Sequence, residues 1–348
     1  MRYCVAWQSE TPAGKALRGA GMIESQGRIA PTSPLAPTRV IVRAASEFML
    51  EGVAEGMKTF GSVRRVVIFT AIVVANVQPI TRSAVRTWRY ADLDHIPPDS
   101  QRRPVSIMGL AGSLGSPLET TRNNVATLIE DGFCIRVENG VIVPNAVLQS
   151  PALIAMDEAL SASFWKMIAD LKALGFDFEQ VRGRKDVDSD LGLEPGFRVA
   201  GAQGPPTRLI SRVTAEFYLA SILGGSAPFG GDWTACAVFG AVMSINAEAM
   251  GKSLDEAWRY ARADTPPPDA VRRPATIREV AARLNLDRES ARRHVHGLIK
   301  GGRVVKGDKG YLANTAYMQT PPSQAAAVEM TKAFYRMIYD LTALGVEL

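Results

Sequence analysis

Apolar residues recur at helical spacing through much of the chain, and the pattern is clearest between residues 276 and 300. Two short segments there carry apolar residues every three or four positions, as the buried face of a helix does. These positions are Ile277, Val280, Ala281 and Leu284 in the first segment, and Ala291, Val295, Leu298 and Ile299 in the second. The pattern predicts two consecutive helices whose apolar faces point inward.

The residues around the two segments predict where each helix begins and ends. Thr276 can cap the first helix and Asp287 can start the second, because short polar side chains accept hydrogen bonds from the first amides of a helix. Asn285 tolerates the left-handed backbone of a tight turn, and Leu286 behind it supplies an apolar contact at the corner. Gly301-Gly302 ends the second helix, because glycine adopts the required backbone angles without steric cost.

A small hairpin is predicted after the second helix. Residues 303–305 and 311–312 can pair as strands around the loop 306–310, which places Lys306 and Lys309 near the tip. On the second helix, the polar residues face away from the apolar stripe or flank it. They are Arg288, Glu289, Ser290, Arg292 and Arg293, and these side chains are the candidates for contact with base edges.

Residues 276–298 follow the pattern T-x-x-E-V-A-x-x-L-N-L-D-x-x-S-A-x-R-H-V-x-x-L. With the hairpin, this segment resembles the winged helix-turn-helix transcriptional regulators, although Asn285 stands where glycine is usual. The resemblance implies that the second module, residues 274–312, binds double-stranded DNA. Its second helix would enter the major groove and its hairpin would touch the DNA backbone or the minor groove. The residues so implied are Arg288, Ser290, Arg292 and Arg293 on the helix, and Lys306 and Lys309 on the hairpin.

The charge of this segment also favours a polyanionic partner. Residues 271–310 contain eleven Lys or Arg and four Asp or Glu, whereas the whole chain of 348 residues has a net charge of only +5. Such a concentration of positive charge is typical of nucleic-acid-binding surfaces. The alternative is a solvated amphipathic segment without a ligand, but the charges of such a face are usually mixed more evenly.

The chain contains two copies of one unit, which align at an offset of 169 residues and then, after a one-residue difference, of 170. Matching runs are Thr38-Arg39 with Thr207-Arg208, Trp88–Ala91 with Trp258–Ala261, Pro97–Asp99 with Pro267–Asp269, Arg102–Pro104 with Arg272–Pro274, and Ala173–Gly175 with Ala343–Gly345. Matches of this density indicate an internal duplication.

Each unit has the same predicted order of elements. An amphipathic helix is followed by a strongly apolar helix, a short helix with the Trp-Arg-Tyr-Ala residues, a Pro-Pro turn, a winged module and a closing helix. The expected helices span about 39–54, 63–77 and 151–175 in the first unit, and about 208–222, 233–249 and 321–345 in the second. The units occupy residues 38–176 and 207–348, with a linker at 177–206. Residues 1–37 are expected to be disordered, and Met22 and Met49 are alternative starts of the reading frame.

Helices before and after a winged module, in this order, resemble the layout of MarR-like regulators, in which flanking helices of two chains interlock to form the dimer. Here both partners would lie on one chain. The expected fold is mainly α with small β-wings, in which tandem winged helix-turn-helix units are related by a pseudo-two-fold axis. The two apolar helices would form the shared helical core. The sequence leaves open whether two whole chains form a further homodimer.

The first winged module, residues 104–142, keeps the fold signals of the second but not its charge. Ser106 can cap its first helix, Leu114-Gly115 marks the turn, and Ser116-Pro117 favours a helix start with proline at the first helical position. Between residues 101 and 143, four Arg and four acidic residues cancel. The candidates for DNA contact are Thr120, Arg122 and Asn123. This module could read bases while the second supplies the attraction, or it could be structural or contact a protein.

Two further sets of residues have alternative roles. The paired arginines before each module are expected to contact DNA phosphates, or else to cap the preceding turn. They are Arg102 and Arg103 in the first unit, and Arg272 and Arg273 in the second. Trp88 and Trp258 could line the pocket of a small-molecule effector, but packing anchors are the more common role of such aromatic residues.

The sequence favours no enzyme, metal or cofactor. His294 and His296 are two residues apart on a helix and therefore point in different directions. The segment 250–253 resembles the end of a phosphate-binding loop, but Asn246 stands where glycine is required. The three cysteines, Cys4, Cys134 and Cys236, are scattered, as in a reducing compartment.

We therefore expect a cytoplasmic location. The first residues lack the pattern of a secretion signal, and the apolar run at 66–77 is shorter than a membrane span. The leading hypothesis is a bacterial-type transcription regulator that binds DNA in a sequence-specific manner. Its rivals are a protein-interaction or anti-repressor module built on the same folds, and an enzyme within the helical core.

Overall fold

The computed structural model describes residues 38–181, 205–250, 254–262 and 264–348, and these residues are mainly helical, with two small antiparallel sheets. The segment 1–37, expected to be disordered, and most of the expected linker, 182–204, lie outside the described residues. The mainly α fold with two small β-hairpins agrees with the expectation from the sequence.

In the first half, three helices precede the module and two follow it. They are α3 (Thr38–Phe60), α4 (Val63–Thr81) and α5 (Ala84–Arg89), and then α8 (Asn145–Leu148) and α9 (Pro151–Ala173). A 3₁₀ turn, Asp99–Gln101, leads into the first module, which consists of α6 (Ile107–Leu114), α7 (Leu118–Glu130), β1 (Ile135–Val137) and β2 (Gly140–Ile142). The strands pair with Ile135 opposite Ile142.

The second half repeats this order. It contains α11 (Thr207–Ser226), α12 (Trp233–Ala247), α13 (Leu254–Arg259), the 3₁₀ turn Asp269–Val271, α14 (Ile277–Arg283), α15 (Arg288–Lys300), β3 (Val304–Gly307), β4 (Gly310–Ala313), α16 (Thr315–Met318) and α17 (Pro321–Ala343). Short 3₁₀ turns also occur at Phe178–Gln180 and Ala227–Phe229. The strands pair with Val304 opposite Ala313, so the second module extends one residue beyond the expected end.

Three expectations about element boundaries were wrong by a small margin. Pro117 is the residue before the first turn of α7 and not its first helical residue, which is Leu118. Lys306 lies inside β3, opposite Tyr311, because the hairpin closes through the two residues Asp308 and Lys309. The opening helices α3 and α11 also extend further than the sequence predicted, to Phe60 and Ser226.

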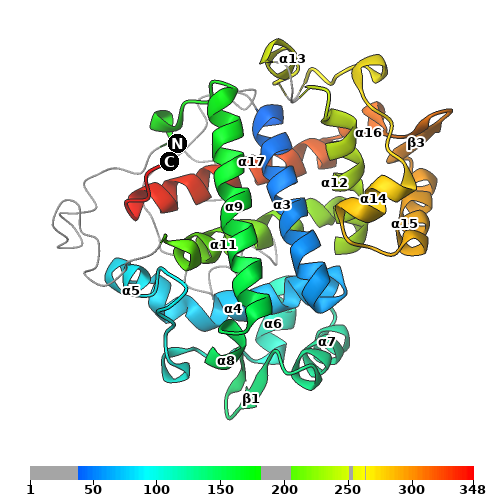
Figure 1. Cartoon of the computed structure of the whole chain (residues 1–348). Coiled ribbons are helices and arrows are strands. Elements are labelled where there is room, and N and C mark those ends of the chain that lie inside the picture. Colours follow the sequence, from blue (N-terminus) through cyan, green and yellow to red (C-terminus); the bar gives the residue numbers. More distant parts are fainter. Residues whose placement is uncertain (1–37, 182–204, 251–253, 263) are drawn as a thin grey trace.

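The helices of the two halves interlock. Figure 1 shows α3 and α9 running side by side, with α4, α11 and α17 crossing them. Helix α17 of the second half packs on α3 of the first, and α9 of the first half packs on α11 of the second. The apolar helices α4 and α12 contribute to one core cluster with residues from both halves, as the sequence predicted for them. Each module packs on the apolar helix of its own half.

The contacts between the halves occur in reciprocal pairs. The indole Nε1 of Trp88 donates to the carbonyl of Leu344 at 2.7 Å, and that of Trp258 donates to the carbonyl of Leu174 at 2.6 Å. Both acceptors are the C-terminal caps of the closing helices of the opposite half. The two tryptophans therefore hold the halves together, in agreement with the packing alternative.

Arginines of the two opening helices make a second reciprocal set across the halves. Arg43 Nη2 donates to the carbonyl of Ala257 at 2.9 Å, and Arg212 Nη2 donates to that of Thr87 at 2.8 Å. The backbone amides of Arg39 and Arg208 also donate to the carbonyls of Ala261 and Ala91, respectively, both at 2.8 Å. Exchanging the halves therefore reproduces these hydrogen bonds.

Helix α4 is long and apolar enough to cross a membrane by length and composition. However, 61% of its most apolar 18-residue window is buried within the protein. Core helices pass the same test, and the contacts of α4 with α3, α11 and the first module are those of a core helix.

Glu216 on α11 makes the stability of the fold dependent on pH. Its burial and, secondarily, the charge of Asp340 raise the pKa of Glu216 to about 7, although Arg336 opposes the shift. A carboxyl with a raised pKa in the folded state stabilises that state while it is protonated. This contribution is complete below the unfolded value of 4.5 and is lost as the pH rises through about 7. We expect the free energy of unfolding to fall over this range by on the order of 2–3 kcal/mol relative to Glu216→Gln.

Urea titrations between pH 4.5 and 8 measure this effect. The matched control is Glu158→Gln on the exposed face of α9, whose profile should run parallel to that of the unmodified chain. Parallel profiles for Glu216→Gln and the unmodified chain would contradict the prediction.

Candidate nucleic-acid interface

The local sequence of the second module fixes its two helices in the predicted way. Glu279 donates its backbone amide to Thr276 Oγ1 at 3.2 Å, and the amide of Thr276 donates to Glu279 Oε2 at 2.8 Å, so the start of α14 has a complete capping box. Asn285 has a φ of +50°, and it is the only residue other than glycine with a positive φ in the described part of the chain. Asp287 Oδ1 accepts from the amide of Ser290 at 2.8 Å and caps α15.

Helix α15 is strongly two-sided. Ala291, Val295 and Leu298 are buried against α12 and α14, and the opposite face is open to solvent. Arg288, Glu289, Arg292 and Arg293 are exposed, and Ser290 is half-buried. The structure therefore places all five predicted reading-helix residues on or beside the exposed face.

In the free protein, neighbouring side chains hold two of these arginines. Arg292 Nη2 lies 2.6 Å from Glu289 Oε1, and this contact holds the pKa of the Glu289 carboxyl below its usual value. Arg293 Nη2 donates to Ser290 Oγ at 3.2 Å. Exposed ion pairs within one helix contribute little to stability, so a phosphate or a base edge can replace these partners at small cost.

The hairpin of the second module presents both predicted lysines. Lys306 and Lys309 are exposed, on β3 and in the turn. Gly310 has a φ of +138°, and a Cβ atom at this position would lie 2.5 Å from the carbonyl oxygen of Ala275. The backbones of Ala275 and Tyr311 exchange hydrogen bonds of 2.8 and 2.9 Å. The hairpin is thereby attached to the segment that leads into α14.

A buried asparagine in each apolar helix, missed by the sequence reasoning as a structural residue, holds each hairpin. Asn246 Nδ2 donates to the carbonyls of Arg273 and Tyr311 at 2.7 and 3.1 Å, and its Oδ1 accepts from the amide of Ala313 at 2.8 Å. Asn76 makes the same three contacts in the first half, with Arg103, Val141 and Val143. The signal in the sequence was a polar residue at the same place in both apolar helices.

The expectation that Arg102 and Arg272 contact phosphates was wrong. Their side chains are only 1% and 3% exposed. Arg272 Nη1 donates to the carbonyl of Ala313 at 2.6 Å and Arg102 Nη2 to that of Pro97 at 3.1 Å, while each also pairs with the Asp at the start of its 3₁₀ turn. Both guanidinium groups therefore secure the preceding turn, as the alternative role required.

The second arginine of each pair lies nearer the surface. Arg273 pairs with Glu279 and with Glu248, whose Oε2 lies 2.8 Å from Arg273 Nη2. Arg103 is exposed and donates to the side chain of Gln78. Arg273 is thus engaged by two carboxylates, and Arg103 is the more accessible of the two for a phosphate.

The first module has the same pattern of buried positions but a different surface. Arg122 and Asn123 are exposed and Thr120 is half-buried, as their counterparts in α15 are. Met108 and Leu118 are 73% and 40% exposed. The offset of 170 places them where the second module has Arg278 and Arg288, and the sequence reasoning missed this exchange of cations for apolar side chains.

No metal site accompanies these surfaces in the described ranges, where no group of three or more His, Cys, Asp or Glu side chains could hold an ion. His294 is half-buried and His296 is exposed on α15. Burial raises the pKa of the Cys134 and Cys236 thiols to about 12, so neither is poised as a nucleophile.

No protein-family model, curated protein or solved structure matches the chain. The chemistry and geometry of the two modules are therefore the features that indicate a function.

Proposed function

We propose that the chain is a sequence-specific, double-stranded DNA-binding transcription regulator and not an enzyme. The observation that carries the proposal is the exposed cationic face of α15, formed by Arg288, Arg292 and Arg293 on a helix whose other face is buried. Such a helix projects guanidinium groups without disturbing its own packing, and arginine pairs well with guanine edges and phosphates. Lys306 and Lys309 on the adjacent hairpin add positive charge to the same module.

The same proposal assigns the two modules as winged helix-turn-helix units, arranged as in a MarR-like dimer but within one chain. Its support is the order of elements in both halves and the reciprocal hydrogen bonds of Trp88 and Trp258 between them. If both modules dock, the half-sites would lie about one helical turn apart, on the order of 10 base pairs. They would differ in sequence because the exposed residues of α7 and α15 differ. Such a regulator would act in the cytoplasm.

A second function, contact with a protein, is supported for the first module by its exposed apolar side chains. Met108, Leu118 and Ile135 are each at least 40% exposed. Met108 and Leu118 stand where the second module has Arg278 and Arg288, and apolar side chains there suit a protein partner better than a phosphate backbone. In this alternative the second module alone would bind DNA, or the whole chain would be an anti-repressor without base-specific reading.

Binding measured against salt concentration tests the proposal. Contacts of Arg288, Arg292, Arg293, Lys306 and Lys309 with phosphates would release about five counterions, so log affinity should fall with log salt at a slope of roughly −4 to −5. Between 50 and 200 mM salt this slope corresponds to a loss of several hundredfold. Fluorescence anisotropy with a labelled duplex measures it. An affinity that hardly changes over this range would remove the basis of the proposal.

A further inference from the structure

Four exposed arginines form a cationic strip where α4 ends and α5 begins. They are Arg82, Arg86, Arg89 and Arg103. The guanidinium of Arg103 donates to the side chain of Gln78 on α4, and the carbonyl of Gln78 accepts from the amide of Arg82 at 3.3 Å. Arg86 and Arg89 are three residues apart on α5 and therefore share one face of that helix. These four residues, the arginine strip, lead from the start of the first module to α5.

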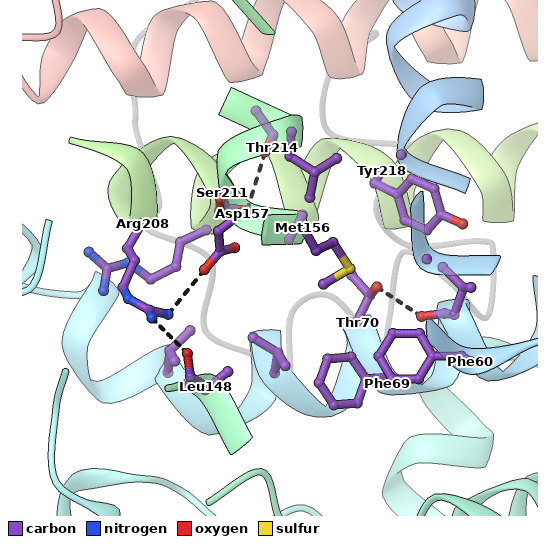
Figure 2. A pocket seen from close by; sticks show the side chains of 18 of the residues that line it. Phe60, Phe69, Thr70, Leu148, Met156, Asp157, Arg208, Ser211, Thr214 and Tyr218 are labelled. Carbon is purple, nitrogen blue, oxygen red and sulfur yellow. Dashed lines mark hydrogen bonds and ion pairs between the residues drawn. The ribbon is translucent and has the colours of Figure 1, made fainter. Parts of the chain in front are cut away.

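The arginine strip is not engaged by the rest of the described chain. Apart from that of Arg103, its guanidinium groups make no hydrogen bond or ion pair with any described residue. The arginines that join the halves differ. Arg208 pairs with Asp157 and donates to the carbonyl of Leu148, as Figure 2 shows, and Arg212 also donates to a backbone carbonyl of the first half. Both are buried, whereas the strip leaves its charges free for an external partner.

Comparison of the two halves shows that the fold does not require the arginines of α5. The equivalent helix of the second half, α13, has Asp255 and Glu256 in its first turn, at the positions of Val85 and Arg86. Both helices have the same length and end at an arginine. Since the same helix forms with acidic residues, the cations of α5 are a property of the surface and not of the packing.

Helix α4 places the parts of the first half in a fixed order. Near its start, Arg65 Nη1 lies 3.1 Å from Oδ2 of Asp131, the residue that ends α7. Roughly 16 Å further along the helix, Asn76 holds the hairpin. The arginine strip follows, and Figure 1 shows α5 at the end of α4 that lies away from α7. A duplex that is contacted by α7 and then by the hairpin therefore continues toward the strip.

The chemistry of the strip fits a phosphate backbone. Arginine pairs with phosphate through two parallel hydrogen bonds, and each strand of a duplex presents one phosphate about every 3.4 Å along the axis. The first module itself is electrically neutral and attracts a duplex little. A membrane surface fits less well, because interfacial helices bury a wide apolar face and Val85 is the one large apolar side chain exposed on α5.

We propose that the arginine strip binds the phosphate backbone of the duplex that flanks the half-site of the first module. Arg82, Arg86 and Arg89 each pair with a phosphate, and Arg103 connects this contact to the half-site. The inference rests on the proposed function and extends it. The bound duplex is contacted further out on the side of the first module than on the side of the second, where α13 is acidic. The strip thus supplies the attraction to DNA that the first module lacks.

Salt titrations of the full chain on two duplexes of random sequence, about 20 and about 40 base pairs long, test this proposal. The shorter duplex covers the two half-sites, and the longer one extends beyond both hairpins. Three additional phosphate contacts should steepen the slope of log affinity against log salt by roughly 2–3 on the longer duplex. Replacing Arg82, Arg86 and Arg89 together with alanine should remove this difference. It should weaken binding to the longer duplex by at least roughly tenfold at about 50 mM salt and leave binding to the shorter one unchanged.

Single changes provide matched controls. Arg89→Ala should lower the slope on the longer duplex by about 0.9, whereas Arg259→Ala, at the equivalent exposed position of α13, should leave it unchanged. Arg86→Glu introduces the residue that α13 carries at this position, Glu256, so the helix accepts it. This variant should lower the slope at least as much as Arg89→Ala, which keeps the test decisive if the triple variant does not fold.

The outcomes separate this proposal from the proposed function. Equal slopes on the two duplexes, or equal effects of Arg89→Ala and Arg259→Ala, would overturn the strip and leave the proposed function standing, because α15 contacts both duplexes. If the triple variant binds DNA normally but no longer binds vesicles of phosphatidylcholine and phosphatidylglycerol, the strip belongs to a membrane surface and the proposal is wrong. No binding of the unmodified chain to either duplex would refute the proposed function, and the strip's role with it.

Discussion

Replacing Arg292 and Arg293 together with alanine is expected to weaken binding to a specific duplex by roughly two to three orders of magnitude, since each base or phosphate contact contributes about 1–3 kcal/mol. Both side chains project from the exposed face of α15, and their partners Glu289 and Ser290 lie on the same face. The double variant should therefore unfold within about 0.5 kcal/mol of the unmodified chain. Fluorescence anisotropy at fixed salt, with thermal unfolding beside it, measures both effects.

The matched control is the equivalent double change in the first module, Arg122→Ala with Asn123→Ala. Those residues occupy the same exposed positions on α7, but their module is electrically neutral. Their removal should change non-specific affinity little, and it should relax sequence preference in one half-site only if the first module reads bases. If the α15 double variant binds DNA as tightly as the unmodified chain, the regulator proposal is wrong. If the α15 double variant still retains a protein partner in a pull-down and no DNA binding is detected, the protein-interaction alternative is favoured.

The elements of the second module could be predicted from the sequence because their signals are local. Thr276 and Glu279 are three residues apart and form their capping box within one helical turn. The left-handed backbone at Asn285 depends on the residue itself, and Gly302 ends α15 with a φ of +69°. The inward stripe of α15 follows from the spacing of Ala291 and Val295. None of these inferences needed knowledge of distant residues.

The burial of the first arginine of each pair could not be predicted in the same way. Arg272 is buried because the carbonyl of Ala313, 41 residues away, lies where its guanidinium can reach it. A sequence shows the charge of a side chain but not the position of a distant acceptor. For the same reason the sequence could suggest that Trp88 packs, but not that it caps α17 of the other half. Polar contacts between residues far apart in the sequence therefore could not be predicted from local sequence patterns.

The two modules together separate what the fold requires from what its surface adds. Their buried positions match, so both modules can pack on an apolar helix. In both, a buried asparagine of that helix forms hydrogen bonds with the hairpin. Their exposed positions differ, since Met108 and Leu118 replace two arginines. Matching buried positions therefore do not fix the charge of the surface, and one module is cationic while the other is neutral.

Asn246→Leu is expected to detach the second hairpin from α12. The change removes the hydrogen bonds to Arg273, Tyr311 and Ala313. The carbonyl of Arg273 and the amide of Ala313 lose their partner, whereas the carbonyl of Tyr311 still accepts from the amide of Ala275. Because an unpaired buried backbone group costs about 1–3 kcal/mol, the free energy of unfolding should fall by on the order of 3 kcal/mol or more. If the hairpin opens locally, hydrogen exchange of the Ala313 amide should accelerate by roughly a hundredfold, since each 1.4 kcal/mol is a factor of ten.

Asn76→Leu provides the control within the same chain, because Asn76 holds the first hairpin through Val141 and Val143. It should accelerate exchange of the Val143 amide and leave that of Ala313 nearly unchanged, and Asn246→Leu should do the reverse. Binding to DNA distinguishes the two variants further. Loosening the second module displaces Lys306 and Lys309 relative to α15 and should weaken binding, whereas loosening the neutral first module should affect non-specific affinity little. Equal protection of both amides in both variants would show that the asparagines do not hold the hairpins.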